Sequence, residues 1–218
     1  MTHELYLDIE TIPTSDEGVI DRLMGSAKAP SNYKDPEKIA AYVEGQKQTR
    51  IDHTGLEGTW GEVVVVGYAV GGGKPQVEVR RPGEGEKPYL IRVANVLQQK
   101  LDGDMLPFVI GHNVMFDMRF LWQRAVINKV HLGFQLPVGR PPYSMEYFDT
   151  MQEWAGYREN ISLGDLCFAL GIKHDDSFSG SDVAAAWANG ERSLVVDHCL
   201  DDISTVRQVY KRLVGYGR

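Results

Sequence analysis

The chain opens with an alternation of apolar and polar residues. Over positions 5–10, apolar residues alternate with Tyr6, Asp8 and Glu10. A period of two predicts a strand with one buried face. Asp8 and Glu10 therefore project from the same side of this strand, two residues apart.

The later hydrophobic patterns predict a mixture of strands and helices. Alternating or continuous apolar runs predict strands at 62–70, 76–80, 108–110 and 147–150. Apolar residues spaced three and four apart predict helices at 36–43, 88–101, 116–125, 163–170, 183–188 and about 194–214. Strands cluster early and helices late, which favours an α/β fold in which a mixed sheet is flanked by helices.

A polar stretch from 14 to 60 separates the first two strands. Its predicted helix begins at Pro36, a residue favoured in the first helical turn. We interpret the stretch as an inserted flap or a long decorated loop. At 218 residues the chain has the length of one α/β domain, so we expect a single domain over 1–218.

Composition places the chain among ordinary globular proteins, with 43% hydrophobic and 24% charged residues. Its apolar runs are too short to span a bilayer, and its start does not resemble a secretory signal. Cys167 and Cys199 lie far apart and form no disulfide framework, so we expect a reducing, cytoplasmic location and no membrane partner.

The net charge of −7 limits the ways in which the chain can bind nucleic acid. It argues against a protein that coats nucleic acid by bulk electrostatics, because that mode requires a basic surface. It does not exclude an enzyme that acts on nucleic acid, since bound cations can supply local positive charge.

Acidic residues recur at positions where a fold can bring them together. Asp8 and Glu10 either form a solvated strand face or, because like charges repel, share a cation. Asp117 lies where the strand at 108–110 gives way to a helix, a place where functional groups concentrate. His198 and Asp202 are four apart and share one helix face. Hard carboxylate oxygens suit Mg²⁺ or Mn²⁺, and such a set predicts a two-metal phosphoryl-transfer site.

The order of these motifs resembles the 3′–5′ exonucleases of the DEDD (DnaQ-like) superfamily, and among them the predicted PolB-like exonuclease group. Leu7–Pro13 is similar to the first exonuclease motif, positions 111–117 to the second, and His198 with Asp202 and Thr205 to the third. The segments that link the motifs also fit, at 148–151, 161–167 and 180–183.

One position departs from the pattern of that superfamily. Three residues separate His198 from Asp202. At this spacing the superfamily usually has Tyr in place of His198. Its His-bearing branch usually has four residues between the His and the Asp. Moving the motif to Asp201 would break the match to Thr205, so we retain Asp202 as the ligand. The resemblance covers 4–13 and 61–213 and leaves 14–60 unexplained.

The resemblance implies a ribonuclease H-like fold and a metal-dependent 3′–5′ exonuclease that releases nucleoside monophosphates from DNA, preferably single-stranded. It implies two Mg²⁺ or Mn²⁺ ions held by four residues, Asp8, Glu10, Asp117 and Asp202. His198 is expected either to accept a proton from water or to orient it. The expected contacts with the 3′ end of the nucleic acid are Thr11, His112, Asn113 and Phe116.

Two other functions remain open at this level. The same residues would serve a 3′–5′ exoribonuclease, because discrimination between the sugars depends on the shape of the pocket. The same fold could also serve as a catalytically weak nucleic-acid-binding module, which the substitution at His198 favours and the intact carboxylate set disfavours. The biological pathway and the oligomeric state are not indicated by the sequence.

Overall fold

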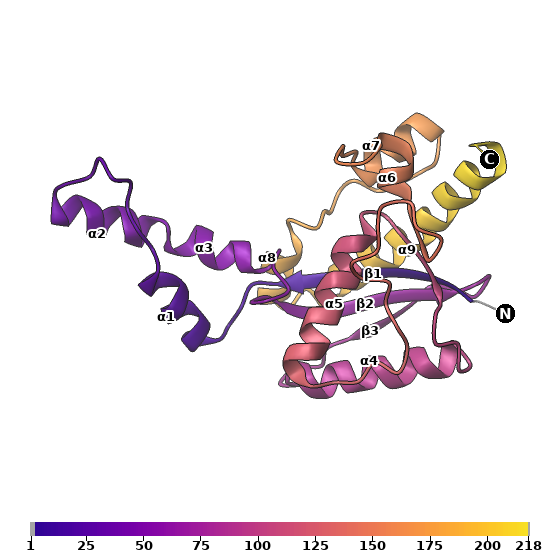
Figure 1. Ribbon diagram of the computed structural model, residues 1–218, viewed down its shortest axis with the longest axis horizontal. Coiled ribbons are helices and arrows are strands. Elements are labelled where there is room, and N and C mark those ends of the chain that lie inside the picture. Colours follow the sequence, from indigo (N-terminus) through magenta and orange to yellow (C-terminus); the bar gives the residue numbers. More distant parts are fainter. Residues whose placement is uncertain (1–2, 218) are drawn as a thin grey trace.

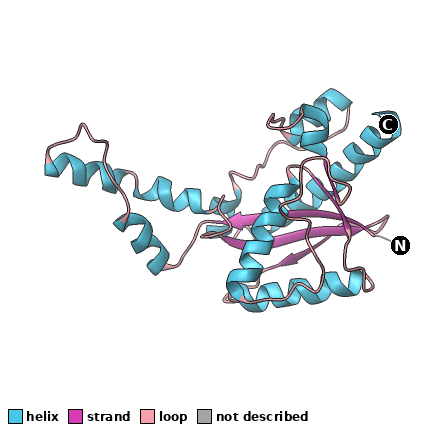
Figure 2. Ribbon diagram, viewed as in Figure 1, coloured by secondary structure: helices cyan, strands magenta, loops and turns pink. Residues whose placement is uncertain are grey.

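The computed structural model describes residues 3–217 and shows a five-stranded sheet with helices on both faces (Figures 1 and 2). The strand order is β3-β2-β1-β4-β5. The strands are β1 (Glu4–Ile12), β2 (Glu62–Val70), β3 (Gln76–Val79), β4 (Phe108–Gly111) and β5 (Tyr147–Asp149). The helices are α1 (Glu17–Gly25), α2 (Pro36–Gly45), α3 (Lys47–Thr54), α4 (Glu86–Lys100), α5 (Val114–Asn128), α6 (Thr150–Ala155), α7 (Leu163–Leu170), α8 (Val183–Ala188) and α9 (Arg192–Gly217).

Strand β1 is central, and its pairing leaves one edge partly open. It pairs antiparallel with β2 along nearly its whole length, with Asp8 opposite Gly67. Its parallel pairing with β4 covers Glu4 to Tyr6. Because β4 ends at Gly111, the second half of β1 extends beyond it. The sheet is therefore mixed, and β1 presents a free edge at the carboxyl end of β4.

The two faces of β1 belong to different layers. Leu5, Leu7 and Ile9 pack into a core formed with α4 and α5. Tyr6 points the other way, into a cluster with α7 and α9. Asp8 and Glu10 follow Tyr6 in the same alternation, so they face the layer of α9.

These observations confirm the expected α/β class and a mixed sheet flanked by helices, consistent with a ribonuclease H-like fold. Each expected strand and helix is present, with ends shifted by a few residues at most. The sequence patterns did not indicate α1, α3 or α6, which are short or bury little apolar surface. Within residues 3–217, no helix combines the length and apolar character needed to cross a membrane.

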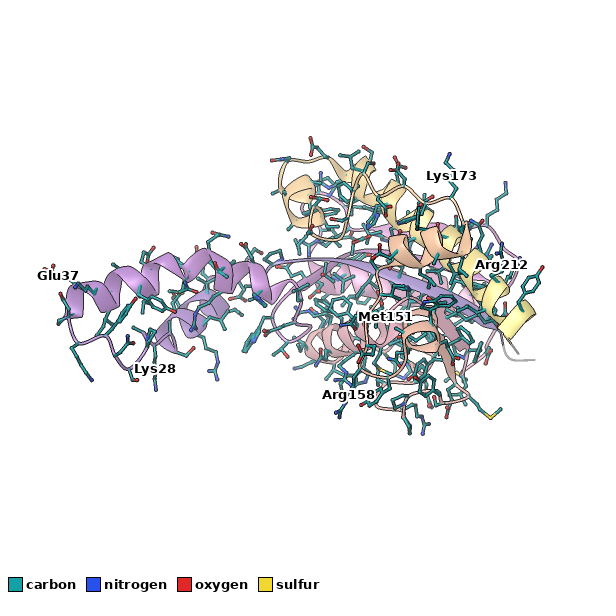
Figure 3. The ribbon with its side chains drawn as sticks, turned by 90° about the horizontal axis from the view of Figure 1, so that it is seen from above. Lys28, Glu37, Met151, Arg158, Lys173 and Arg212 are labelled. Atoms are coloured by element: carbon teal, nitrogen blue, oxygen red, sulfur yellow. The ribbon has the colours of Figure 1, made fainter. Side chains whose placement is uncertain are left out.

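Residues 14–60 form an arm of three helices that projects from one end of the sheet (Figure 3, with Glu37 at its tip). Neither α1 nor α2 contains a buried residue. The base of the arm is tied to the sheet, because the Thr14 N–H donates to Thr54 Oγ1 at 2.8 Å and Thr11 Oγ1 donates to the Gly55 carbonyl at 2.6 Å. The two ends of the arm therefore lie close together. Its role as a flap stays a prediction.

Candidate functional site

Asp8 and Glu10 form the first part of an acidic cluster beneath α9. Ligand atoms of Asp8, Glu10 and Cys199 all lie within 4.8 Å of one another. Glu10 is buried and Asp8 is half-buried. Cys199 is fully buried, and burial raises the pKa of its thiol. Cys199 therefore packs against the carboxylates of β1 as a neutral thiol.

Asp117 reaches the cluster from the first turn of α5. Its Oδ1 accepts the backbone N–H of Ile9 at 3.0 Å, on the edge of β1 that extends past β4. Asp117 is buried, and this burial, followed by the negative charge of Asp8, raises its pKa well above the ordinary value. The third carboxylate of the set therefore lies beside the first two, as the sequence motifs predict.

His198 and Asp202 complete the cluster from α9. His198 Nδ1 lies 3.8 Å from Asp202 Oδ1, one helical turn away. On its other side, His198 Nε2 lies 3.8 Å from Glu10 Oε1. The imidazole also packs against the Phe178 ring, with centroids 5.2 Å apart. His198 is thus held between carboxylates that come from two different elements.

Gly67 allows α9 to approach the sheet closely enough to bring these groups together. It lies opposite Asp8 on β2, and a Cβ added there would lie 2.4 Å from Cys199 Sγ. Any side chain at position 67 would therefore push α9, with His198 and Asp202, away from β1.

The Gly67→Ala variant should be less stable by about 1–3 kcal/mol, because extra volume in a packed core strains its neighbours. For a chain of this length we expect a melting temperature lower by about 2–10 °C. Gly72→Ala is the matched control, since an added Cβ there meets no heavy atom within 4 Å. Adding Cys199→Ala should recover part of the loss. Equal melting temperatures for Gly67→Ala and Gly72→Ala would contradict this role of Gly67.

Burial raises the pKa values of all four carboxyl groups, and repulsion by neighbouring carboxylates adds to the effect. Burial and then the nearby Asp202 carboxylate raise the pKa of Asp8 to about 8. Burial and Asp8 raise the pKa of Glu10 well above its ordinary value. Burial also raises the pKa of Asp202, while His198 acts in the opposite direction. Without a cation, the cluster therefore retains protons that ordinary carboxyl groups release near pH 4.

The cluster has the donor set of a site for a divalent metal ion. Asp8 Oδ2 and Asp202 Oδ1 are buried and accept no hydrogen bond from the described residues. Buried polar atoms are ordinarily paired, so two such oxygens in one cluster indicate a missing positive partner. Closely spaced carboxylate oxygens suit hard divalent cations. The residues present thus fit a bound metal ion.

A neighbouring group that the sequence did not indicate extends the cluster along α9. Ligand atoms of His174, Asp201 and Asp202 lie within 4.8 Å of one another. The imidazole of His174 is buried and lies 3.2 Å from Asp201 Oδ2. The two residues are 27 positions apart, so no local spacing could reveal this contact. His174 attaches the loop before α8 to the helix that carries Asp202.

Three of the residues expected to touch substrate are already engaged within the protein. Both ring nitrogens of His112 lie within hydrogen-bond distance of protein oxygens, those of Thr150 and of the Ile161 carbonyl. Asn113 begins α5 in a left-handed conformation, and its N–H donates to Asp149. Phe116 packs on the core beside Phe120. They surround Asp117 as expected, and their contact with substrate stays a prediction.

Thr11 lines a groove beside the acidic cluster. The groove has a volume of about 740 Å³ and lies between the end of β1, α3 and α8. Small side chains of α8 form one wall, including Ala184 and Ala185, and Leu56 at the end of α3 lies opposite. The groove starts at Thr11, which follows Glu10 directly in the chain. The arm therefore contributes one wall of this groove.

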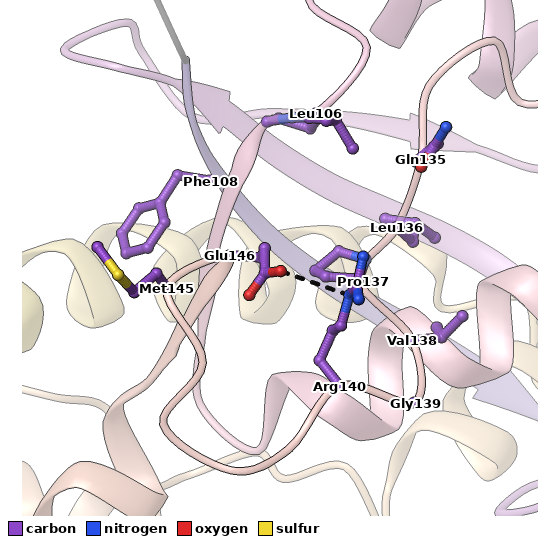
Figure 4. A pocket seen from close by; sticks show the side chains of 11 residues that line it. Leu106, Phe108, Gln135, Leu136, Pro137, Val138, Gly139, Arg140, Met145 and Glu146 are labelled. Carbon is purple, nitrogen blue, oxygen red and sulfur yellow. Dashed lines mark ion pairs between the residues drawn. The ribbon is translucent and has the colours of Figure 1, made fainter.

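A second hollow, of about 450 Å³, lies at the other end of β4 (Figure 4). Its lining includes Phe108, Met145 and the ion pair of Arg140 with Glu146, in which Nε lies 3.5 Å from Oε1. None of the four carboxylates lines this hollow. We therefore place the chemistry at the acidic cluster.

The sequence matches no protein-family model and no curated protein. Among solved structures, the chain is similar to the family B DNA polymerase from the hyperthermophilic archaeon Pyrobaculum calidifontis, with a TM-score of 0.60 and 16% sequence identity. The match covers 98% of this chain and 25% of the polymerase, so the chain spans about a quarter of the polymerase's length. This likeness shows that the chain shares its α/β fold with part of a DNA polymerase.

Proposed function

We propose that this protein is a metal-dependent 3′–5′ exonuclease that releases nucleoside monophosphates from the 3′ end of DNA, preferably single-stranded. The observation that carries the proposal is the convergence of Asp8, Glu10, Asp117 and Asp202, with two buried oxygens unpartnered. The fold shared with part of a DNA polymerase supports a substrate of this class.

The four carboxylates are proposed to hold two Mg²⁺ or Mn²⁺ ions. Bound divalent ions of this kind lower the pKa of water and stabilise charge on a leaving oxygen. The charge of Asp8 raises the pKa of both Glu10 and Asp117, so Asp8 lies near both of these carboxylates. It is therefore our candidate for a ligand shared by both ions.

His198 is proposed to accept the proton of the attacking water. Its two ring nitrogens lie 3.8 Å from carboxylate oxygens of Glu10 and Asp202, so the imidazole adjoins two of the proposed metal ligands. The contact with the Phe178 ring holds the imidazole in place. Proton transfer by a positioned side chain contributes about 10²–10⁴-fold to a rate.

The pH dependence of the rate tests this role of His198. With saturating metal at each pH, the native rate should fall on acidification, because a protonated imidazole cannot accept the proton of the attacking water. In His198→Ala and His198→Gln the rate should be lower by about 10²-fold or more, and that acid limb should be lost. The same acid limb in native and variant proteins would show that His198 does not act as the base.

The groove between β1, α3 and α8 is proposed to hold the terminal nucleotide, on the far side of the carboxylates from the rest of the strand. It includes Thr11, which follows Glu10 in the chain, and its lining combines the small side chains of α8 with large apolar ones such as Leu56 and Trp187. An apolar wall suits the flat faces of bases and does not select among them, as a processing exonuclease requires. The Thr11 hydroxyl is bonded to the Gly55 carbonyl, so Thr11 ties the wall of the groove to the end of β1.

Replacement of the arm tests its contribution to this groove. Because Thr14 and Thr54 are hydrogen-bonded, a short Gly-Ser linker can replace residues 16–51 without moving β1. We expect a higher KM and an altered preference between single and double strands, with unchanged dependence on metal concentration. Kinetics on labelled substrates of both kinds measure this. Unchanged activity on every substrate would exclude a role for the arm.

A further inference from the structure

A third hollow lies on the surface, between α6, α7 and the last turns of α9. It has a volume of about 390 Å³ and is lined by five residues, Trp154, Leu170, Arg212, Leu213 and Tyr216. Figure 1 shows α6 and α7 beside the C-terminal part of α9, and Figure 3 places Arg212 at the end of the molecule opposite the tip of the arm. We call these five residues the α6–α9 surface.

The aromatic side chains of this surface are unusually accessible. Trp154 is 46% exposed and Tyr216 is 87% exposed. Large aromatic side chains gathered around an open hollow mark a binding surface more often than a folding requirement. Neither Trp154 nor Tyr216 contributes to the buried core.

The last turns of α9 carry a charge opposite to that of the whole chain, whereas α6 and α7 carry the acidic residues Glu153 and Asp165. From Ile203 to Gly217, α9 carries Arg207, Lys211 and Arg212 and no acidic residue. The chain as a whole has a net charge of −7. The guanidinium of Arg212 lies 5.9 Å from the ring centre of Tyr216, so cation and aromatic ring adjoin at this surface. Exposed aromatic rings interleaved with cations are the pattern that single-stranded nucleic acid recognises.

Two helices lead from the acidic cluster to this surface. Helix α6 begins at Thr150, whose hydroxyl donates to the Gly111 carbonyl at the end of β4, and Trp154 follows one turn later. Along α9, Arg212 follows Asp202 by ten residues, or about 15 Å at the helical rise. A strand whose 3′ end lies at the carboxylates can therefore extend to the α6–α9 surface.

We propose that the α6–α9 surface binds the single strand upstream of its 3′ end, with bases stacked on Trp154 and Tyr216 and the backbone near the cations of α9. This inference rests on the proposed exonuclease function, because it uses the acidic cluster to place the 3′ end. It identifies the preferred substrate as a single strand several nucleotides long. The surface retains the strand between successive cleavages and takes no part in the chemistry.

The test compares Trp154→Ala/Tyr216→Ala with Trp122→Ala. Trp122 lies on α5, away from this surface, and is 44% exposed, so it is a matched control. Binding of a fluorescent oligothymidylate of about 20 nucleotides is measured by anisotropy in EDTA. We expect the double variant to bind about 10-fold or more weaker for each lost stacking contact, and Trp122→Ala to bind like the native protein. The melting temperatures of the two variants should agree closely, because Trp154 and Trp122 are exposed to a similar extent and Tyr216 is almost fully exposed.

Kinetics separate this proposal from the proposed function. On the long strand, the double variant should show a raised KM, and on a dinucleotide its kcat/KM should equal that of the native protein. If the native protein digests DNA and the double variant has unchanged affinity and KM, the proposed role of the α6–α9 surface is wrong. The proposed exonuclease function would stand, and a protein would be favoured as the partner of this surface. No digestion by the native protein would refute the exonuclease, while the anisotropy comparison would still decide whether the surface binds strands.

Discussion

Asp8→Asn should lower the metal-dependent rate of nucleotide release by about 10³-fold or more while leaving the protein folded. Removing a shared ligand forfeits several kcal/mol of charge stabilisation in the transition state, and each 1.36 kcal/mol corresponds to a factor of ten. The substitution keeps the shape of the side chain and removes one of the mutually repelling charges. The metal-free variant should therefore melt at or above the native temperature.

Single-turnover rates at saturating Mn²⁺, with native protein, Asp8→Asn and Asp197→Asn, measure this effect. Asp197 is the matched control because it undergoes the same chemical change on α9, next to His198 in sequence, at an exposed position. Its variant should cleave like the native protein. A rate for Asp8→Asn within a factor of ten of native would show that Asp8 is not a shared ligand.

The second large effect is a change in the free energy of unfolding with pH and with bound metal. The folded pKa of Asp8 is raised to about 8 by burial and by Asp202, against about 3.9 for an ordinary Asp. A group shifted in this direction stabilises the fold fully below its unfolded pKa and loses that contribution as pH rises through its folded pKa. The metal-free protein should therefore become less stable between about pH 4 and pH 8. Glu10 and Asp117 act in the same direction.

A bound divalent cation should reverse this loss. At pH 8, Mn²⁺ at about 100 times its Kd adds about 2.7 kcal/mol to the free energy of unfolding. For a chain of this size that corresponds to about 5–10 °C in melting temperature. At pH 5 the shift should be much smaller, because protons compete for the carboxylates. Asp8→Asn should show a reduced shift at pH 8.

Thermal melts at pH 5 and pH 8, with EDTA or Mn²⁺, measure the effects of pH and of bound metal on stability. A metal-free protein that is more stable at pH 8 than at pH 5 would contradict the raised pKa values. An equal Mn²⁺ shift at both pH values would contradict binding at the acidic cluster. Both results are independent of catalytic activity.

The fold could be predicted from the sequence where burial imposes a clear period. The run from Glu62 to Val70 indicated β2 because both its faces are buried, and α7 and α8 were bounded correctly by their apolar spacing. The arm could not be predicted in the same way. Its helices α1 and α3 bury almost no side chains, so no apolar stripe distinguishes them from a polar loop.

The acidic cluster was predictable where its members are linked by local spacing. Asp8 and Glu10 share a face because they are two apart on a strand, and His198 and Asp202 share one because they are four apart on a helix. The contact of His174 with Asp201 was not predictable, since it joins a loop to a helix. The internal hydrogen bonds of His112 were likewise invisible in the sequence, because they depend on Thr150 and Ile161.

The role of Gly67 shows the limit of motif reasoning. In the sequence it is one glycine within an apolar strand. In the structure it lies opposite Asp8 and against Cys199, where it determines how closely α9 approaches β1. Only the packing of two distant segments reveals that the geometry of the carboxylates depends on it.

The most direct test of the central claim is digestion of single-stranded DNA labelled at its 5′ end, in parallel with RNA of the same sequence. Each is incubated with EDTA, Mg²⁺ or Mn²⁺, using the native protein and Asp8→Asn. The account predicts a ladder that shortens from the 3′ end with metal, is absent with EDTA and with Asp8→Asn, and forms faster on DNA. No ladder with either metal would contradict it and would favour a module that binds nucleic acid without cleaving it.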